Sequence, residues 1–164
     1  ILDPFAGTST FTVRLLQSGL IKPEDLARKY ANELFATEIM LLAYYVSAVN
    51  IETTYNALRE EAALRNGEPA PEYVPFTNIA LADTFQIHEE GDIPDLNIFR
   101  ENNETIERQK KAPINVVIGN PPYSAGQKSA NDLNANLKYP SLDKRIAETY
   151  AAKSTATNLS LIHI

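Results

Sequence analysis

Residues 1–10 read ILDPFAGTST, and this stretch decides the fold. Its first three residues are typical of the end of a buried strand, the next five form a tight turn, and a helix is expected over 8–18. Thr8 or Ser9 would cap that helix, and Gly19 would end it. A strand, a glycine turn and a helix in this order form the first unit of a doubly wound α/β fold.

The rest of the chain repeats this alternation. Further strands are expected where apolar residues run nearly unbroken, at 34–38, 77–82 and 114–118. Because residues 114–118 are almost wholly apolar, we predict that they form a central parallel strand covered on both faces. The pattern indicates an α/β fold with a mostly parallel sheet and flanking helices.

Further helices follow from starts, stops and periodicity. They are expected after Pro23 and at 39–65, 103–110 and 142–153. In the long helix, which Gly67 would end, Leu42, Val46 and Val49 lie at helical spacing and should face the sheet. Residues 88–113 are polar and rich in loop-forming residues, which predicts an insertion at the edge of the fold.

The composition is that of a globular domain. Of the 164 residues, 44% are hydrophobic and 22% are charged. No apolar run reaches the roughly 20 residues needed to cross a bilayer, and no signal-peptide pattern is visible, so we expect a cytoplasmic protein. The chain has no cysteine and only two histidines, which argues against disulfides and against thiolate or histidine metal sites.

The net charge and the two ends bear on the kind of protein. A net charge of −6 argues against a stand-alone nucleic-acid-binding module, because phosphate contacts require a basic surface. It remains compatible with a catalytic domain whose grip on DNA comes from elsewhere in a longer chain. Because the sequence starts at Ile1 without methionine and ends in an apolar stretch, we expect a fragment of a larger protein.

The first turn is a candidate cofactor site, since it follows the carboxyl end of a strand, where α/β sheets bind ligands. It comprises Asp3, Pro4, Phe5, Ala6, Gly7 and Thr8. Gly7 lets the backbone approach a ligand closely, and the helix that follows offers unpaired N–H groups. Glu38 and Asp83, after the second and third strands, are placed to accept hydrogen bonds from a ribose diol and an adenine amine. The alternatives are a turn without ligand, a helix N-terminal acid at Glu38 and a capping acid at Asp83.

The turn after the strand at 114–118 carries the candidate catalytic residues. They are Asn120, Pro121, Pro122 and Tyr123. An exocyclic base amine is a poor nucleophile because its lone pair is delocalised into the ring. The side-chain oxygen of Asn120 and the carbonyl of Pro121 could accept both amine hydrogens and free that lone pair. The prolines would fix both acceptors in place, and Tyr123 offers a flat face for an extruded base.

At this point the chain resembles a known family. The motif at residues 3–8 resembles the cofactor motif of amino-methylating DNA methyltransferases, and the motif at 120–123 resembles their catalytic motif for adenine N6. Their order is that of the gamma class. The residues at 14–19, 41–45, 119–136 and 153–158 also resemble the methyltransferase region of single-polypeptide restriction-modification enzymes of the type ISP kind.

The resemblance implies a truncated Rossmann-like S-adenosylmethionine-dependent methyltransferase domain over residues 1–158, with a tail at 159–164 that does not continue the family pattern and is an artefact. The cofactor would be S-adenosylmethionine, held by residues 3–8, Glu38 and Asp83, and the substrate double-stranded DNA with a flipped adenine held by residues 120–123. Nuclease, motor and target-recognition domains would lie elsewhere on the same parent chain, and no membrane is involved.

The sequence departs from the family pattern at one position, and three alternative functions remain open. The family usually has glycine where this chain has Ser9, whose side chain would crowd the methionine part of the cofactor. Motifs like that at 120–123 also serve enzymes that methylate a protein glutamine or guanine N2 in RNA. The third alternative is a non-catalytic module that binds S-adenosylmethionine and positions a larger enzyme on DNA.

Overall fold

The computed structural model describes residues 1–87, 89, 100–122 and 139–154. These residues fall into two compact units, and each is considered by itself. The first unit consists of Ile1–Thr84 and Pro94–Asn120, and the second of Phe85–Ile93 and Pro121–Ile164. The candidate cofactor residues all lie in the first unit, whereas the candidate catalytic turn begins in the first and continues in the second.

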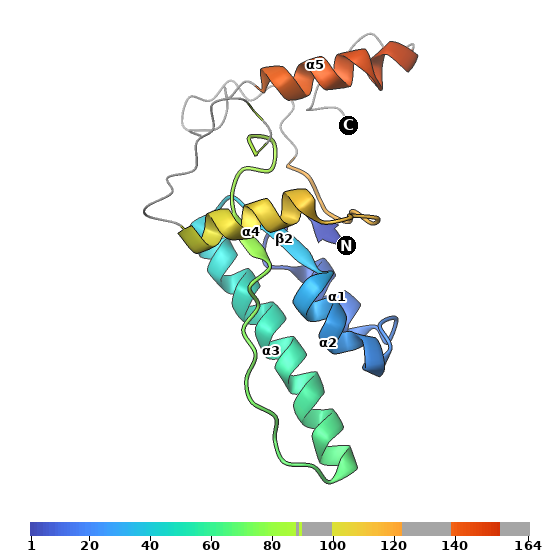
Figure 1. Cartoon of the computed structure of the whole chain (residues 1–164), viewed down its shortest axis with the longest axis vertical. Helices are drawn as coiled ribbons and strands as arrows, with labels where there is room; N and C mark the ends of the chain where they lie inside the picture. The colour runs from blue at the N-terminus through green and yellow to red at the C-terminus, as the bar shows by residue number, and fades with distance from the viewer. Residues whose placement is uncertain (88, 90–99, 123–138, 155–164) are drawn as a thin grey trace. The chain divides into compact units, whose positions relative to one another are not determined.

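The first unit is built on a small parallel sheet. Its strands are β1 (Leu2–Asp3), β2 (Phe35–Glu38) and β3 (Ile79–Leu81), in the spatial order β1-β2-β3. Each strand lies within a segment that the sequence predicted to be extended. The sheet alternates with helices along the chain (Figure 1), which confirms the α/β class.

The fourth predicted strand is where the structure differs. Residues 114–118 lie beside β1, where Leu2 donates to the Val116 carbonyl and Ile118 donates to the Leu2 carbonyl, both at 2.9 Å. This pairing amounts to a single parallel bridge between Leu2 and Val117. Val117 is 64% exposed, so the prediction of a central strand covered on both faces is wrong. Among the described residues this segment is the edge of the sheet, and an apolar run looks the same whether or not it is covered.

Four helices complete the described part of the first unit, and Figure 1 labels them. They are α1 (Thr10–Gln17), α2 (Pro23–Asn32), α3 (Leu41–Asn66) and α4 (Arg100–Lys111). Proline opens α2, as its fixed φ favours. Gly67 ends α3 in the left-handed conformation, with φ of 70°, which glycine adopts without steric cost. Both boundaries are those that the sequence predicted.

The buried face of α3 is not the predicted one. Leu42, Val46 and Val49 are 76%, 38% and 55% exposed. The helix instead packs through a stripe that contains Ser47, Ile51 and Tyr55. Apolar residues occur on every side of this helix, so more than one stripe has helical spacing. Spacing alone therefore does not identify the buried stripe.

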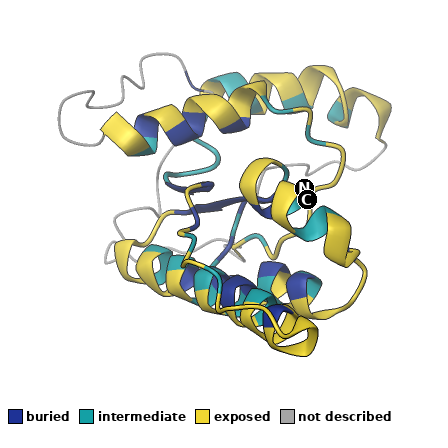
Figure 2. Ribbon diagram, turned by 60° about the horizontal axis from the view of Figure 1, so that its bottom comes forward, coloured by how far each residue is buried: buried dark blue, intermediate teal, exposed yellow. Residues whose placement is uncertain are grey.

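Helix α4 covers the opposite face of the sheet from α3. Ala36 packs in the apolar cluster that includes Ile51 of α3, whereas Thr37 donates to Gln109 of α4 at 3.0 Å. Because neighbouring residues of a strand point to opposite faces, α3 and α4 lie on the two sides of β2. The buried strands accordingly lie between helices (Figure 2). The predicted short helix is confirmed, but it belongs to the body of the fold and not to an edge insertion.

The same helix covers the outer edge of β3. Leu81 donates from its backbone to Asn102 at 2.7 Å, and the Asn102 amide donates back to the Leu81 carbonyl at 2.9 Å. The Thr77 carbonyl accepts from Arg108 at 2.7 Å. Side chains thus take the place of a neighbouring strand and leave less of this edge open to pairing with another chain.

The core lies between α2, α3 and the loop before β3. Tyr30 and Tyr55 stack with ring centroids 3.5 Å apart, and Phe76 packs against Tyr30 at 5.2 Å. The Tyr30 hydroxyl donates to the Val74 carbonyl at 3.1 Å, so its burial leaves no unpaired polar group. Burial raises the pKa of Tyr30 well above its ordinary value.

The described part of the second unit contains α5 (Pro140–Glu148) and a 3-10 turn, η1 (Ala151–Lys153), which overlap the helix predicted at 142–153. Glu89 accepts from the backbone N–H groups of Ser141 and Leu142, both at 2.9 Å, and so caps the start of α5. The tail at 159–164 lies outside the described residues. No described helix is long and apolar enough to traverse a bilayer.

Candidate functional site

The position of the candidate site follows from the order of the strands in the sheet. From β1 the chain proceeds to β2 and β3 on one side, and it returns to the other side of β1 at Val117. The strand order therefore reverses at β1. In open α/β sheets such a switch point leaves a crevice at the carboxyl ends of the strands, where ligands bind. Here these ends carry Asp3, the last residue of β1, and Gly119 and Asn120 after the bridge.

The turn that follows β1 is anchored to the end of β2. Gly7 has a positive φ of 55°, and its N–H donates to Glu38 Oε2 at 2.7 Å. The Ala6 N–H donates to the Thr37 carbonyl at 2.9 Å. The predicted neighbours Gly7 and Glu38 are thus in direct contact, although 31 residues separate them in the sequence.

Glu38 serves two backbone groups at once. It is 8% exposed, and its Oε1 accepts from the Met40 N–H, immediately before α3, at 2.9 Å. Each carboxylate oxygen thus accepts one backbone hydrogen and retains a second lone pair. Glu38 therefore shapes the turn and also remains a possible acceptor for a ligand hydroxyl.

Asp3 is a buried carboxylate with one oxygen unused. It is 1% exposed, and its Oδ1 accepts from the Phe5 N–H at 3.2 Å. Oδ2 is buried and has no hydrogen-bond partner among the described residues. Burial, together with the nearby charge of Glu38, raises the pKa of Asp3. A buried acceptor without a partner is costly, so Oδ2 marks a place where a donor or a cation would be stabilised.

Ser9 adopts a conformation that favours glycine. Its φ of 64° is the only positive φ among the described non-glycine residues, and the left-handed region costs a residue with Cβ about 1–2 kcal/mol. Ser9 stands at the N-cap position of α1, but its side chain makes no capping bond. Its hydroxyl instead bonds that of Ser47 on α3, and both residues are fully buried. Ser9, one of the two predicted capping residues, is thus the N-cap residue by position, but its side chain does not cap the helix.

The second motif starts beside the first. A Cβ at Gly119 would lie 3.1 Å from Asp3 Oδ1 and 3.2 Å from Pro4 Cδ. Only glycine leaves room for the two turns to approach this closely. Asn120 follows directly, at the surface of the first unit.

The rest of the predicted catalytic motif lies outside the first unit. Pro121 and Pro122 belong to the second unit, where Pro121 is half-buried and Pro122 is exposed. Tyr123 lies outside the described residues.

The turn after β3 also reaches this edge. Asp83 is half-buried and follows β3 by two residues. Next to it, the hydroxyl of Thr84 donates to the carbonyl of Pro4. The structure thus joins the turns after β1 and β3, and the three predicted acids lie at or just after the carboxyl ends of three neighbouring strands. The described residues include no cluster of three or more side chains able to hold a metal ion.

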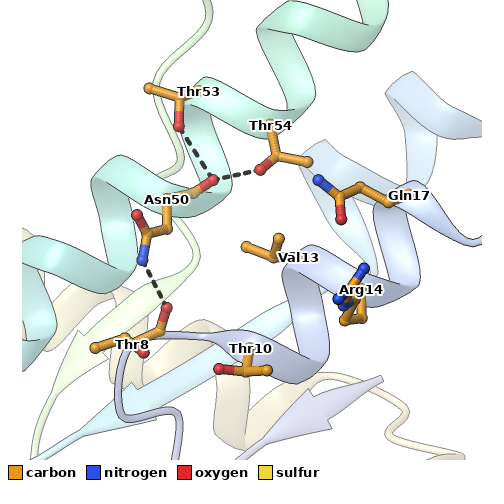
Figure 3. Close-up of a pocket in the computed structure, with 8 residues that line it drawn as sticks. All are labelled: Thr8, Thr10, Val13, Arg14, Gln17, Asn50, Thr53 and Thr54. Carbon is orange, nitrogen blue, oxygen red and sulfur yellow. Dashed lines mark hydrogen bonds between the residues drawn. The ribbon is translucent and has the colours of Figure 1, made fainter.

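A polar groove lies on the other side of the first turn (Figure 3). It is about 410 Å³ in volume and is lined by Thr8, Thr10, Val13, Arg14, Gln17, Asn50, Thr53 and Thr54. It lies between residues of α1 and α3, and its lining does not include the acids at the strand ends. Across it, the Asn50 amide donates to the Thr8 carbonyl at 3.0 Å (Figure 3).

Sequence reasoning missed the residues that hold the turns together, namely Ser47, Asn50 and Thr84. One signal was present for Ser47, which lies at four-residue spacing with Ile51 and Tyr55. A small polar residue in an otherwise apolar buried stripe indicates a specific partner. Asn50 and Thr84 leave no such local pattern.

Three solved structures are similar to this chain over 96% of its length. A nuclease-deletion mutant of the Type ISP restriction-modification enzyme LlaGI, in complex with a DNA substrate mimic, is 44% identical with a TM-score of 0.77. The ATP-dependent Type ISP restriction-modification enzyme LlaBIII bound to DNA is 41% identical with a TM-score of 0.78. A DrdV–DNA complex solved by cryo-electron microscopy is 39% identical with a TM-score of 0.72.

The similarity covers only a small part of those proteins. This chain spans 13%, 10% and 14% of the LlaGI, LlaBIII and DrdV chains, respectively. No protein-family model matches the chain, and a comparison with curated proteins found no match. The predicted likeness to type ISP restriction-modification enzymes is confirmed as a likeness to one segment of such enzymes.

Proposed function

We propose that this chain forms the cofactor-binding and catalytic region of an S-adenosylmethionine-dependent DNA adenine-N6 methyltransferase within a larger restriction-modification enzyme. The sheet would then be the first part of a Rossmann-like methyltransferase fold. The observation that carries the proposal is the approach of Gly119 to Asp3 and Pro4, at 3.1 Å and 3.2 Å from a built Cβ. It puts the start of the catalytic motif against the cofactor motif at the switch point of the sheet.

The buried acids supply the test of fit for the cofactor. S-adenosylmethionine carries an ammonium group, a ribose diol and an adenine amine, and all three are hydrogen-bond donors. Asp3 Oδ2, buried and without a partner among the described residues, suits the ammonium group. Glu38 suits the diol through its remaining lone pairs, and Asp83 suits the adenine amine, each at the end of its own strand.

The chemistry at the base would depend on Asn120 and its neighbours. When bound, the cofactor supplies a methyl group on a positively charged sulfur. Asn120 and the Pro121 carbonyl would accept the two hydrogens of the adenine amine and direct its lone pair toward that methyl group. Tyr123 would stack on the extruded base. No strong base is needed if the proton leaves after the methyl group is transferred.

The DNA would be held largely by other parts of the full-length protein. The net charge of −6 gives this chain little to attract phosphates. The three similar structures are DNA complexes of chains about seven to ten times longer, as their 10–14% coverage requires. We therefore assign this region the cofactor and the target base, and we assign nuclease, motor and sequence recognition to the remainder.

The test is a methyl-transfer assay with the full-length protein. DNA, ribosomal RNA and release-factor protein are each incubated with radiolabelled S-adenosylmethionine, and the products are digested and separated. We expect the label in N6-methyladenine from DNA. Label only in methylguanine from RNA or in methylglutamine from protein would overturn the choice of substrate. Cofactor binding without any transfer would favour the non-catalytic alternative.

A further inference from the structure

The turn after β1 is held at three consecutive residues by hydrogen bonds to β2 and α3. Gly7 donates to Glu38 at the end of β2 at 2.7 Å. The carbonyl of Thr8 accepts from Asn50 on α3 at 3.0 Å (Figure 3). The hydroxyl of Ser9 bonds that of Ser47, one helical turn before Asn50. The shape of the turn is therefore imposed by β2 and α3, and not by its own sequence alone.

The last of these contacts is closed to solvent. Ser9 and Ser47 are each 0% exposed, and among the described residues each hydroxyl is the other's only side-chain partner. Losing the Ser47 hydroxyl would leave that of Ser9 buried and unpaired, which is unfavourable. Ser9 also holds the left-handed conformation, with φ of 64° and ψ of 36°, in which a residue with Cβ is disfavoured. A buried partner at Ser47 offsets that preference.

We propose that Ser47 is a positioning residue for the cofactor site. Through its bond to Ser9 it keeps the turn in the conformation in which Gly7 faces the strand ends. It thereby lets serine occupy a place that otherwise favours glycine. The Ser9 side chain points to α3, so it satisfies Ser47 and does not act as the N-cap of α1. This inference rests on the proposed function, because it assumes that the turn binds S-adenosylmethionine.

The pair makes a specific prediction about double substitutions. Ser47→Ala strands the buried Ser9 hydroxyl, whereas Ser9→Gly removes that hydroxyl and fits the left-handed conformation at the same time. A serine left alone at position 47 can bond a carbonyl of its own helix. Ser9→Gly should therefore be tolerated alone, and it should rescue Ser47→Ala.

The experiment uses the full-length protein and S-adenosylmethionine itself. Affinity is measured by titration calorimetry, and kcat and KM for the cofactor are measured in the methyl-transfer assay. We expect Ser47→Ala to weaken affinity about tenfold, because the turn relaxes in the free enzyme and must return to a conformation with a buried, unpaired hydroxyl when the cofactor binds. KM should rise with kcat held within about twofold, as for loss of binding common to ground and transition states. Ser9→Gly/Ser47→Ala should return to within about threefold of the wild type.

Thr53→Ala is the matched control. It removes a hydroxyl from the same helix that bonds only carbonyls of that helix, at 2.7 Å and 3.3 Å, and its affinity should not change. An unchanged affinity in Ser47→Ala, or a double variant no better than Ser47→Ala, would overturn the positioning role. So would a fall in kcat without a rise in KM, since that marks a general loss of folded enzyme. A wild type that binds no S-adenosylmethionine would overturn the proposed function and this inference with it.

Discussion

The N–H of Gly7 lies 2.7 Å from Glu38 Oε2, so the turn after β1 and the acid that ends β2 form one hydrogen-bonded unit. Glu38→Gln tests it with little change in shape. An amide has one acceptor oxygen, so its NH₂ group must face the N–H of either Gly7 or Met40. We expect the free energy of unfolding in urea to fall by about 1–3 kcal/mol. Cofactor affinity should fall as well.

Glu24→Gln provides the control for that substitution. Glu24 is an exposed acid in the first turn of α2, away from the site. Its loss should change the free energy of unfolding by no more than about 0.5 kcal/mol and leave cofactor affinity as it is. Equal effects of the two substitutions would mean that Glu38 acts only through the charge of the chain.

Asp3→Asn should weaken cofactor binding and raise the stability of the fold. Burial raises the pKa of Asp3, so the folded chain holds this proton to a higher pH than the unfolded chain does. The wild type therefore loses stability as pH rises from the ordinary value of 3.8 to the raised value, and the penalty persists above it. At pH 7 the variant should be more stable by about 0.5–2 kcal/mol, typical of single stabilising substitutions.

The pH dependence distinguishes this explanation from a general effect of asparagine. As the pH falls well below the ordinary pKa of 3.8, Asp3 becomes neutral in the folded and the unfolded chain, and the difference in unfolding free energy should close. Urea titrations at several pH values measure it. A difference that stays constant with pH would show that ionisation of Asp3 is not its cause.

Gly119→Ala should push the two motifs apart. The added Cβ would lie 3.1 Å from Asp3 Oδ1 and 3.2 Å from Pro4 Cδ, closer than ordinary contacts. Overpacking of this kind costs about 1–3 kcal/mol. We expect lower stability in urea titrations and a loss of methyl transfer larger than the loss of cofactor affinity. Transfer at the wild-type rate would mean that the approach of the two turns is not needed.

Asn120→Ala should abolish methyl transfer and leave cofactor binding nearly intact. Removing one preorganised polar group at a reacting centre typically lowers kcat about 10²–10³-fold. Asn115→Ala is the control, because Asn115 is exposed and donates only to the nearby Pro113 carbonyl at 3.3 Å. If Asn120→Ala lost cofactor binding to the same extent as transfer, Asn120 would belong to the cofactor site instead.

Asn102→Ala should uncover the outer edge of β3. It leaves the N–H and carbonyl of Leu81 without the bonds of 2.7 Å and 2.9 Å that Asn102 supplies. We expect a loss of about 1–3 kcal/mol in unfolding free energy, with more self-association in sedimentation velocity. Asn102→Asp retains the acceptor for Leu81 and should lie between the two. Sedimentation unchanged in Asn102→Ala would mean that other contacts protect the edge.

The sequence predicted what depends on local signals. Pro23 begins α2 and Gly67 ends α3, because each residue has a strong backbone preference of its own. Asp3 and Glu38 were expected at the ends of the first two strands and Asp83 after the third, and each lies there. Such signals need only the residue and its immediate neighbours.

What it could not predict depends on partners far along the chain. The exposed Val46 and the buried Ile51 both belong to stripes of helical spacing on α3, and only the packing of the sheet chooses between them. The exposure of Val117 likewise depends on what covers it. The Ser9–Ser47 bond joins residues 38 positions apart and leaves no local pattern at Ser9.

The bridge between Leu2 and Val117 has a consequence for synthesis. Leu2 and the cofactor turn leave the ribosome first, and the partner on the other side of β1 follows 115 residues later. The nascent chain can lay β1 against β2 early, but it cannot close the crevice until Gly119 and Asn120 emerge. The proposed cofactor site is thus complete only once residues 119 and 120 have been synthesised, together with the start of the predicted catalytic turn.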